Sequence, residues 1–221
     1  MTSEPPSRPL RRDARLNRER IVDSAREVFA VRGIAATLDD VAHRAGVGVG
    51  TVYRRFPTKE ALLWAAFEEH LDQHAKDIEA ALRAPTGWIG LVRFLHRAAE
   101  IHAANRGIRD IVLGADLGQR HFEQIRRRIF PLVEQLVERA RAEGALRPDF
   151  TAGDVPMLLM MVSEVAHHSR DVRPDAYARY MQLLIDGLRH APDNGDLGDP
   201  LSRSDVNTLT AQWLPGTQPR G

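Results

Sequence analysis

The sequence predicts an all-α protein. Apolar residues recur at helical spacing along most of the chain, and the alternation of apolar and polar residues that marks strands is nearly absent. Ala, Leu, Arg and Glu, which favour helices, are abundant, whereas aromatic residues make up only 6%. With 221 residues, 43% of them hydrophobic, the chain can bury a substantial core in one large or two smaller domains. We expect about nine helices.

The composition argues against several classes of protein. The chain has no cysteine, which excludes disulfides, thiolate zinc sites and cysteine nucleophiles. No run approaches the roughly 20 apolar residues of a membrane span, and the Pro- and Arg-rich N-terminus lacks the apolar centre of a signal peptide. The sequence offers no phosphate loop and no nucleophile elbow. We therefore expect a cytoplasmic protein with no membrane partner, no catalytic residue and no cofactor.

Charge is distributed unevenly along the chain. Residues 1–60 hold twelve Arg and Lys against eight Asp and Glu, whereas the remainder holds nineteen against twenty-two. The net charge of +1 is therefore the sum of a basic N-terminal part and a mildly acidic remainder. This asymmetry is expected when only one end of a protein meets nucleic acid.

The N-terminal part is expected to begin with a disordered basic arm over residues 1–13, because its prolines oppose helix formation and it has little to bury. A first helix follows over about residues 14–32, and Gly33 ends it. Its core-facing stripe consists of Ile21, Val22, Ala25, Val28 and Phe29.

Two short helices joined by a glycine turn are predicted next, at about residues 37–56. Thr37 is an N-cap, and Asp40 three residues later completes an approximate capping box. Gly46 breaks the first short helix where a left-handed residue suits the turn. A second short helix runs from about Gly48 to Arg55, with Val52 inward. This is the pattern of a helix-turn-helix, in which one helix braces another that lies in the major groove.

The stretch TLDDVAHRAGVGVGTVYRRFPTKEALL (residues 37–63) resembles the N-terminal DNA-binding domain of the tetracycline-repressor (TetR) family of bacterial transcription regulators. The resemblance covers about the first third of the chain. Its most specific blocks are GTVY and FxxKE. The residues that match the family pattern are Thr37, Val41, Ala42, Ala45, Gly46, Val47, Gly50, Thr51, Val52, Tyr53, Phe56, Lys59, Glu60, Leu62 and Leu63.

This resemblance implies a three-helix helix-turn-helix DNA-binding domain over residues 14–75 and a helical ligand-binding and dimerisation domain over residues 76–191. One departure concerns Gly48, which stands where the family often has serine and which supplies no hydroxyl to a phosphate. The candidate DNA-contacting residues are Thr37, Arg44, Val49, Gly50, Thr51, Tyr53, Arg54 and Lys59. Arg54 is the long donor able to make a bidentate contact to guanine. Arg11, Arg12 and Arg15 are candidates for an arm along the minor groove.

Helical periodicity continues beyond the resemblance. A long helix over residues 58–84, capped by Thr58, leads to further helices at about residues 87–105, 107–115, 119–143, 152–170 and 173–190. Residues 192–221 are rich in Pro, Gly, Asp, Ser and Thr and are expected to form a mostly disordered tail. Trp213 and Leu214 could dock this tail on the body, but a loose tail fits the composition better.

In the family, the C-terminal helices enclose a pocket for a small, mostly apolar ligand. Methionines suit an adaptable pocket wall, although they fill ordinary cores equally well. The candidates here are Phe94, His102, Leu113, Leu117, Phe122, Met157, Met160 and Met161.

The last two predicted helices carry an apolar stripe suited to association. Two such helices from each subunit would form a four-helix bundle across a two-fold axis, as the resemblance also implies. Packing within one subunit would account for part of the stripe. The candidate interface residues are Tyr177, Tyr180, Met181, Leu184 and Leu188.

The favoured interpretation is a homodimeric repressor that a small molecule releases from a pseudo-palindromic DNA operator. Two alternatives stay open. One is a regulator that responds to a protein partner and has no small-molecule ligand. The other is an all-α metal sensor or enzyme that uses Glu164, His167 and His168, whose i, i+3, i+4 spacing can converge on a metal.

Overall fold

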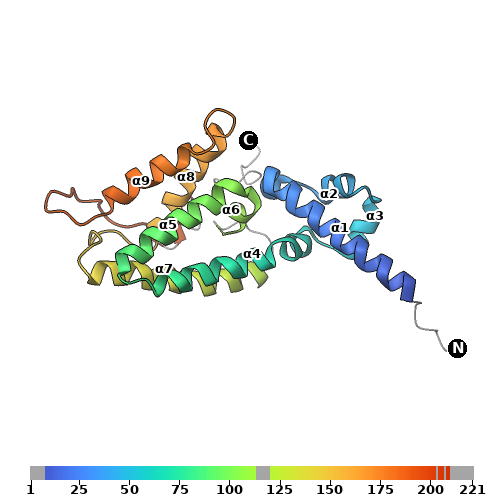
Figure 1. The fold of residues 1–221 in the computed structure, drawn as a ribbon, viewed down its shortest axis with the longest axis horizontal. Helices are drawn as coiled ribbons and strands as arrows, with labels where there is room; N and C mark the ends of the chain where they lie inside the picture. The colour runs from blue at the N-terminus through green and yellow to red at the C-terminus, as the bar shows by residue number, and fades with distance from the viewer. Residues whose placement is uncertain (1–7, 113–119, 203, 207, 210–221) are drawn as a thin grey trace.

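The fold is an elongated assembly of helices, seen here in a computed structural model that describes residues 8–112, 120–202, 204–206 and 208–209. Three helices gather at one end, the remaining ones pack at the other, and α4 runs between them (Figure 1). The elements are α1 (Arg8–Arg32), the 3₁₀ turn η1 (Gly33–Ala35), α2 (Leu38–Ala45), α3 (Val49–Arg55), α4 (Lys59–Leu82), α5 (Gly87–Ala104), α6 (Arg106–Val112), α7 (Arg120–Ala142), α8 (Asp154–Ser169) and α9 (Ala176–Gly187).

The all-α prediction is confirmed. The described residues contain no strand, only an isolated antiparallel bridge between Leu146 and Arg189. None of the described helices has an apolar stretch long enough to cross a bilayer. Thr58 caps α4 as expected, since its hydroxyl accepts the Ala61 N–H at 3.1 Å.

The start of α1 differs from the prediction. The helix begins at Arg8, so that part of the expected disordered arm is helical, and residues 1–7 lie outside the described residues. Pro9 is compatible with this start because a proline in the first helical turn lacks only an N–H that has no partner within the helix.

Two hydrophobic cores divide the molecule. The first joins α1, η1, α2, α3 and the start of α4, down to Leu71, and we call residues 8–71 the head. The second begins on α4 at Ala75 and joins it to α5, α7, α8 and α9, and we call residues 75–190 the body. The short helix α6 belongs to the body by sequence, yet Ile108 and Ile111 on it lie in the core of the head.

The approach of α6 to the head depends on two glycines. A Cβ on Gly107 would lie 2.9 Å from the Phe67 ring and 3.0 Å from the Phe29 carbonyl oxygen. Gly33 has φ 61°, and a Cβ there would lie 2.1 Å from Asp110 Oδ2. Larger residues at either position would push α6 away from the head.

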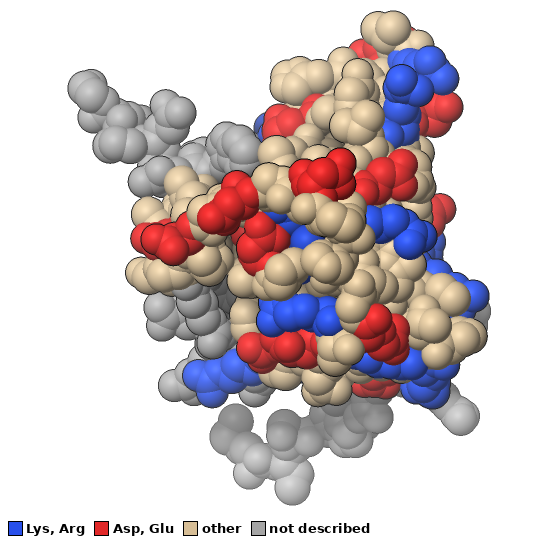
Figure 2. Space-filling view, turned by 90° about the vertical axis from the view of Figure 1, so that its left-hand side faces the viewer, with Lys and Arg blue, Asp and Glu red and all other residues tan. Residues whose placement is uncertain are grey.

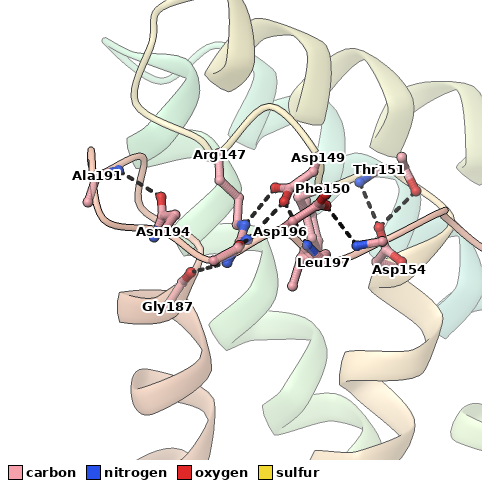
Figure 3. Close-up of polar contacts among 12 residues, drawn as sticks. Arg147, Asp149, Phe150, Thr151, Asp154, Gly187, Ala191, Asn194, Asp196 and Leu197 are labelled. Atoms are coloured by element: carbon pink, nitrogen blue, oxygen red, sulfur yellow. Dashed lines mark hydrogen bonds and ion pairs between the residues drawn. The ribbon is translucent and has the colours of Figure 1, made fainter.

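Part of the predicted tail is bound to the body (Figure 3). Arg147, buried after α7, donates two hydrogen bonds to Asp149 at 2.6 and 2.8 Å and another to the Gly195 carbonyl oxygen. Asp149 in turn accepts the Leu197 N–H at 3.1 Å. The pKa of Asp149 is therefore held below its ordinary value, chiefly by the Arg147 side chain. Composition alone predicted a loose segment because it cannot reveal a buried arginine on another part of the chain.

The tail has a second contact with the body, at Val206. Val206 is buried, and its Cγ2 would lie 3.9 Å from a Cβ added at Gly153, the N-cap of α8. Ser202 and Asp205 form a local cap just before it. The proposed apolar anchors Trp213 and Leu214 lie outside the described residues.

Replacing Arg147 should loosen this segment. Arg147→Met should lower the melting temperature by about 5 °C, because Asp149 and the Gly195 carbonyl lose their donor. Limited proteolysis should then cut near residues 190–202. Arg173→Met is the matched control, since Arg173 and its partner Asp175 are both exposed and their pair contributes little. Equal protease resistance of both variants would contradict the assignment.

Candidate nucleic-acid interface

The turn between α2 and α3 is built by local hydrogen bonds that the sequence predicted. The Thr37 hydroxyl accepts the Asp40 N–H at 3.2 Å, and Asp40 Oδ2 accepts the Thr37 N–H at 2.8 Å. The backbone and hydroxyl of Thr37, helped by Arg32, lower the pKa of Asp40 to about 2. Gly46 ends α2 with φ 62°, the left-handed conformation expected there. The helix-turn-helix geometry follows from these contacts.

The second of these helices, α3, is short and held by its apolar side. Val52 is fully buried and Phe56, directly after the helix, nearly so. Gly48 is its N-cap and makes no side-chain cap hydrogen bond. Because α3 has only 7 residues and contains Gly50, its own helical preference is weak and packing on α2 stabilises it.

The other side of α3 is open to solvent. Val49, Gly50, Tyr53 and Arg54 are exposed, and Thr51 is half-buried. A Cβ added at Gly50 would meet no atom within 4 Å. The predicted contact residues on this helix therefore share a surface that a flat or grooved partner can approach.

Three other predicted contact residues have partners within the protein. Arg44 forms an ion pair with Glu27 of α1, with Nε 2.7 Å from Glu27 Oε2. Thr37 is engaged in the capping box. The Lys59 ammonium donates to the Ile34 carbonyl oxygen, and partial burial lowers the pKa of Lys59. A phosphate would have to compete with these contacts.

Sequence reasoning missed the residues that support this surface from elsewhere. Arg18 of α1 lies over the Phe56 ring, with Cζ 5.6 Å from the centroid. Asp110 of α6 accepts the Ile34 N–H at 3.0 Å. Neither residue carries a motif, because both contacts depend on how distant segments pack.

The minor-groove prediction for Arg11, Arg12 and Arg15 is corrected for the conformation found here. These residues lie within α1, and Arg15 forms an exposed pair with Glu19 at 3.6 Å. An α-helix about 10–12 Å across does not enter a B-DNA minor groove about 6 Å wide. The side chains of Arg11 and Arg12 lie outside the described part of the structure.

The end of the body farthest from α3 carries a mixture of charges among its described residues. Figure 2 looks onto that end, where acidic and basic side chains are interspersed with uncharged ones. The excess of basic residues within positions 1–60 therefore distinguishes the head as the part suited to a polyanion.

The predicted pocket residues are divided between the interior and the surface of the body. Phe94, His102 and Met160 are buried, and Met157 packs against the body core. Met161 is 43% exposed and points away from that core, so it is not a pocket residue here. Leu113, Leu117 and the side chain of Phe122 lie outside the described residues.

The predicted interface residues also separate into two groups. Met181 and Leu188 are buried in the core of their own subunit and are not available to a partner. Tyr177 and Leu184 pack partly against the same core. Tyr180 is exposed as predicted, and Leu183, which the prediction omitted, is 63% exposed beside it on α9.

The metal-site alternative finds no support in the described geometry. Glu164 bonds Arg109 at 3.3 Å and lies 3.5 Å from His168 Nε2. Within the part of the chain that the structure describes, no three His, Asp or Glu residues gather in a way that could hold a metal ion.

Two family profiles match this chain. The profile described as bacterial regulatory proteins of the tetR family matches residues 21–66. The profile described as the C-terminal domain of SbtR-like transcriptional regulators matches residues 86–190. The first matched range lies within the head and the second within the body.

Individual relatives are similar over different lengths. The transcriptional activator FasR of Mycolicibacterium smegmatis is 38% identical over 78 residues, which cover 35% of this chain and only 35% of the relative. The crystal structure of the TetR regulator SCO0520 from Streptomyces coelicolor is 29% identical, covering 78% of this chain and 98% of its own, with a TM-score of 0.50. A structure that explains the control of antibiotic production by bacterial hormones is 28% identical, covering 78% and 97%, with a TM-score of 0.52.

Replacing Gly50 should separate stability from nucleic-acid binding. Gly50→Ala should raise the free energy of unfolding by about 0.5–1 kcal/mol, because alanine favours the helix and its Cβ meets nothing. The same Cβ should weaken DNA binding about tenfold if α3 approaches the bases closely. Gly187→Ala on α9, also free of neighbours, is the control and should leave DNA binding unchanged. Unaltered DNA binding by Gly50→Ala would show that α3 does not approach DNA closely at this point.

Proposed function

The chain belongs to the TetR family of bacterial regulatory proteins, whose members are DNA-binding transcriptional regulators and not enzymes, and we propose that it is a homodimeric repressor released from its operator by a small molecule. The observation that carries the DNA-binding part is the exposed side of α3, held by a capped α2 and a left-handed Gly46. A protein that binds a bacterial chromosome acts in the cytoplasm, which is part of the proposal.

Recognition would use α3 in the major groove. Arg54 would read a base through its guanidinium, while Thr51 and Tyr53 would bind phosphates or base edges. Thr37 and Lys59, at the N-termini of α2 and α4, would add phosphate contacts only by exchanging their present partners. Two such heads in one dimer would bind successive major grooves of a pseudo-palindromic site.

Association would use the outer side of α8 and α9, which lie side by side along the upper edge of the body in Figure 1. Met161 of α8 and Tyr180 and Leu183 of α9 are exposed apolar residues on these two helices. Packing them against a symmetric copy would remove their apolar surface from water and form a four-helix bundle.

An effector bound in the body would act through α6. Asp110 is fully buried, accepts the Ile34 N–H at 3.0 Å, and receives hydrogen bonds from Arg109 at 2.8 and 3.0 Å. A ligand that displaces α6 must therefore disturb the N–H contact of Ile34, and the carbonyl oxygen of the same residue, in the next peptide group, accepts from Lys59. DNA affinity would fall by as much as the ligand prefers the displaced state.

That the effector is a small molecule is supported by the hormone-dependent control stated for one similar structure. The alternative is a regulator governed by a protein partner. It would bind its operator with an affinity that no small molecule changes.

Selection of genomic fragments tests the proposal first. Purified protein at about physiological salt should enrich a short inverted repeat from sheared DNA. Arg54→Ala should relax the preference at one base pair per half-site by about 1–3 kcal/mol, because the guanidinium can no longer pair with a base. Equal losses on the repeat and on random DNA would make Arg54 a phosphate contact. Absence of any enriched sequence would contradict specific regulation.

A charge on the outer side of α9 should separate the subunits. Leu183→Glu should weaken the dimer at least about a hundredfold, because an unpaired carboxylate would be buried between α9 helices. Sedimentation equilibrium measures the effect. Ile89→Glu, at an exposed apolar position on α5, is the control and should leave the dimer intact. Dimers of unchanged affinity in Leu183→Glu would exclude this face.

A further inference from the structure

Two histidines meet inside the body without a role in the mechanism described so far. His74 of α4 and His102 of α5 are each only 2% exposed, and their ring centroids lie 6.2 Å apart. The ring of Phe94 lies 6.2 Å from that of His74. A pair of imidazoles beside an aromatic ring is therefore enclosed between two core helices.

Most of the ring nitrogens in this pair lack a partner. Neither Nδ1 nor Nε2 of His102 has a hydrogen-bond partner, and Nδ1 of His74 also has none. Polar atoms buried in a native protein are nearly always hydrogen-bonded, so each exception requires an explanation. Three exceptions on two adjacent rings indicate a place where something else supplies the hydrogen bonds.

The charge of the pair restricts what that partner can be. Burial lowers the pKa of His74 to about 4, and burial together with the charges of His74 and Arg109 lowers the pKa of His102 to about 3. Both rings are therefore neutral at pH 7, and each neutral ring offers one donor and one acceptor. Arg109 is already bonded to Asp110 and Glu164, so its charge is compensated within the protein.

We propose that His74 and His102 are the polar end of the effector site, and that the effector is a neutral, largely apolar molecule with a group that both donates and accepts hydrogen bonds, such as a hydroxyl or a primary amide. An anion is disfavoured because it would be buried beside two neutral rings, while Arg109, the cation whose charge acts on His102, is already paired with Asp110 and Glu164. The inference rests on the proposed function, since it supposes an effector in the body.

The position of His102 connects this site to α6. His102 lies in the last turn of α5, and α6 begins at Arg106 after a single intervening residue, Asn105. Asn105 fixes that junction, because its side chain accepts the Ile108 N–H at 3.0 Å. A molecule bound to the His102 ring would therefore shift the end of α5 and the start of α6, which contacts the head.

The test uses the full chain, with octanol as the neutral probe and octanoate as the matched anion. Octanol should bind saturably, shift the ring ¹⁵N signals of both histidines, and speed amide exchange at Ile34. Octanoate should bind about tenfold more weakly. His102→Leu and His74→Leu should each weaken octanol binding about tenfold, because hydrogen bonds to the ring are lost. His96→Leu, at a partly exposed position on the same helix, should leave octanol binding unchanged.

Stability of the unliganded variants distinguishes a ligand site from a structural pair. His102→Leu should be at least as stable as the parent, because it removes two buried atoms without partners. A less stable His102→Leu that binds octanol normally would mean that an internal water serves the rings, and would overturn the proposal. Equal binding of octanoate, or no saturable octanol binding to the parent, would also overturn it.

Enrichment of an inverted repeat from genomic DNA tests the proposed regulator, whereas octanol binding tests the proposed effector site, so the two proposals can fail separately. If the parent binds an inverted repeat and octanol fails to bind, the regulator stands and the effector site fails. If no repeat is enriched, the proposed function fails whatever octanol does.

Discussion

The docking of α6 on the head, together with the continuous helix α4, fixes how the head and the body are joined. This helix has 7 residues, yet Ile108 and Ile111 complete the core of the head, and Gly107 lies against Phe29 and Phe67. Its Asp110 is buried completely and holds the Ile34 N–H. Because a buried carboxylate separated from its partners is costly, Asp110 cannot leave Arg109 or Ile34 without a compensating contact. The orientation of head and body therefore depends on this short helix as well as on α4, which runs through both cores.

The same carboxylate is the centre of a longer series of polar contacts. Arg109 joins Asp110 to Glu164, so a continuous path runs from Ile34 in the head to α8. The exposed Met161 lies one turn before Glu164 on that helix, within the proposed dimer face. A continuous series of hydrogen bonds does not by itself couple two binding sites. Such coupling requires a structural element that can adopt two alternative conformations. The short α6, whose apolar residues lie in the head core and which also contacts α5 and α7 of the body, is the element that could have them.

The features that could be predicted from the sequence are those encoded by residues close together in the chain. The capping box of Thr37 and the left-handed Gly46 were readable because each depends on residues a few positions apart. The start of α1 was missed because prolines were weighed without regard to the first-turn position of Pro9. The Arg44–Glu27 pair and the Asp110–Ile34 contact bring together residues 17 and 76 positions apart, and no local pattern encodes them. Met181 and Leu188 of the predicted interface stripe lie in the core of their own subunit, because one helical period cannot distinguish the side facing that core from the side facing a partner.

Lys59 shows how a local conflict in sequence can be resolved by tertiary structure. A cation at a helix N-terminus is unfavourable unless an acceptor or an anion, such as a DNA phosphate, lies beside it. In the folded protein the Ile34 carbonyl oxygen takes that place, and the charges of Asp40 and Asp110 partly oppose the effect of burial on the pKa of Lys59. A DNA phosphate that attracts Lys59 would free the carbonyl oxygen of Ile34, the residue whose N–H Asp110 holds. The proposed phosphate contact and α6 would therefore act on the two peptide groups that flank the Cα of Ile34. In the proposed mechanism, a ligand that shifts this residue would change DNA affinity, and DNA would change the affinity for that ligand by the same factor.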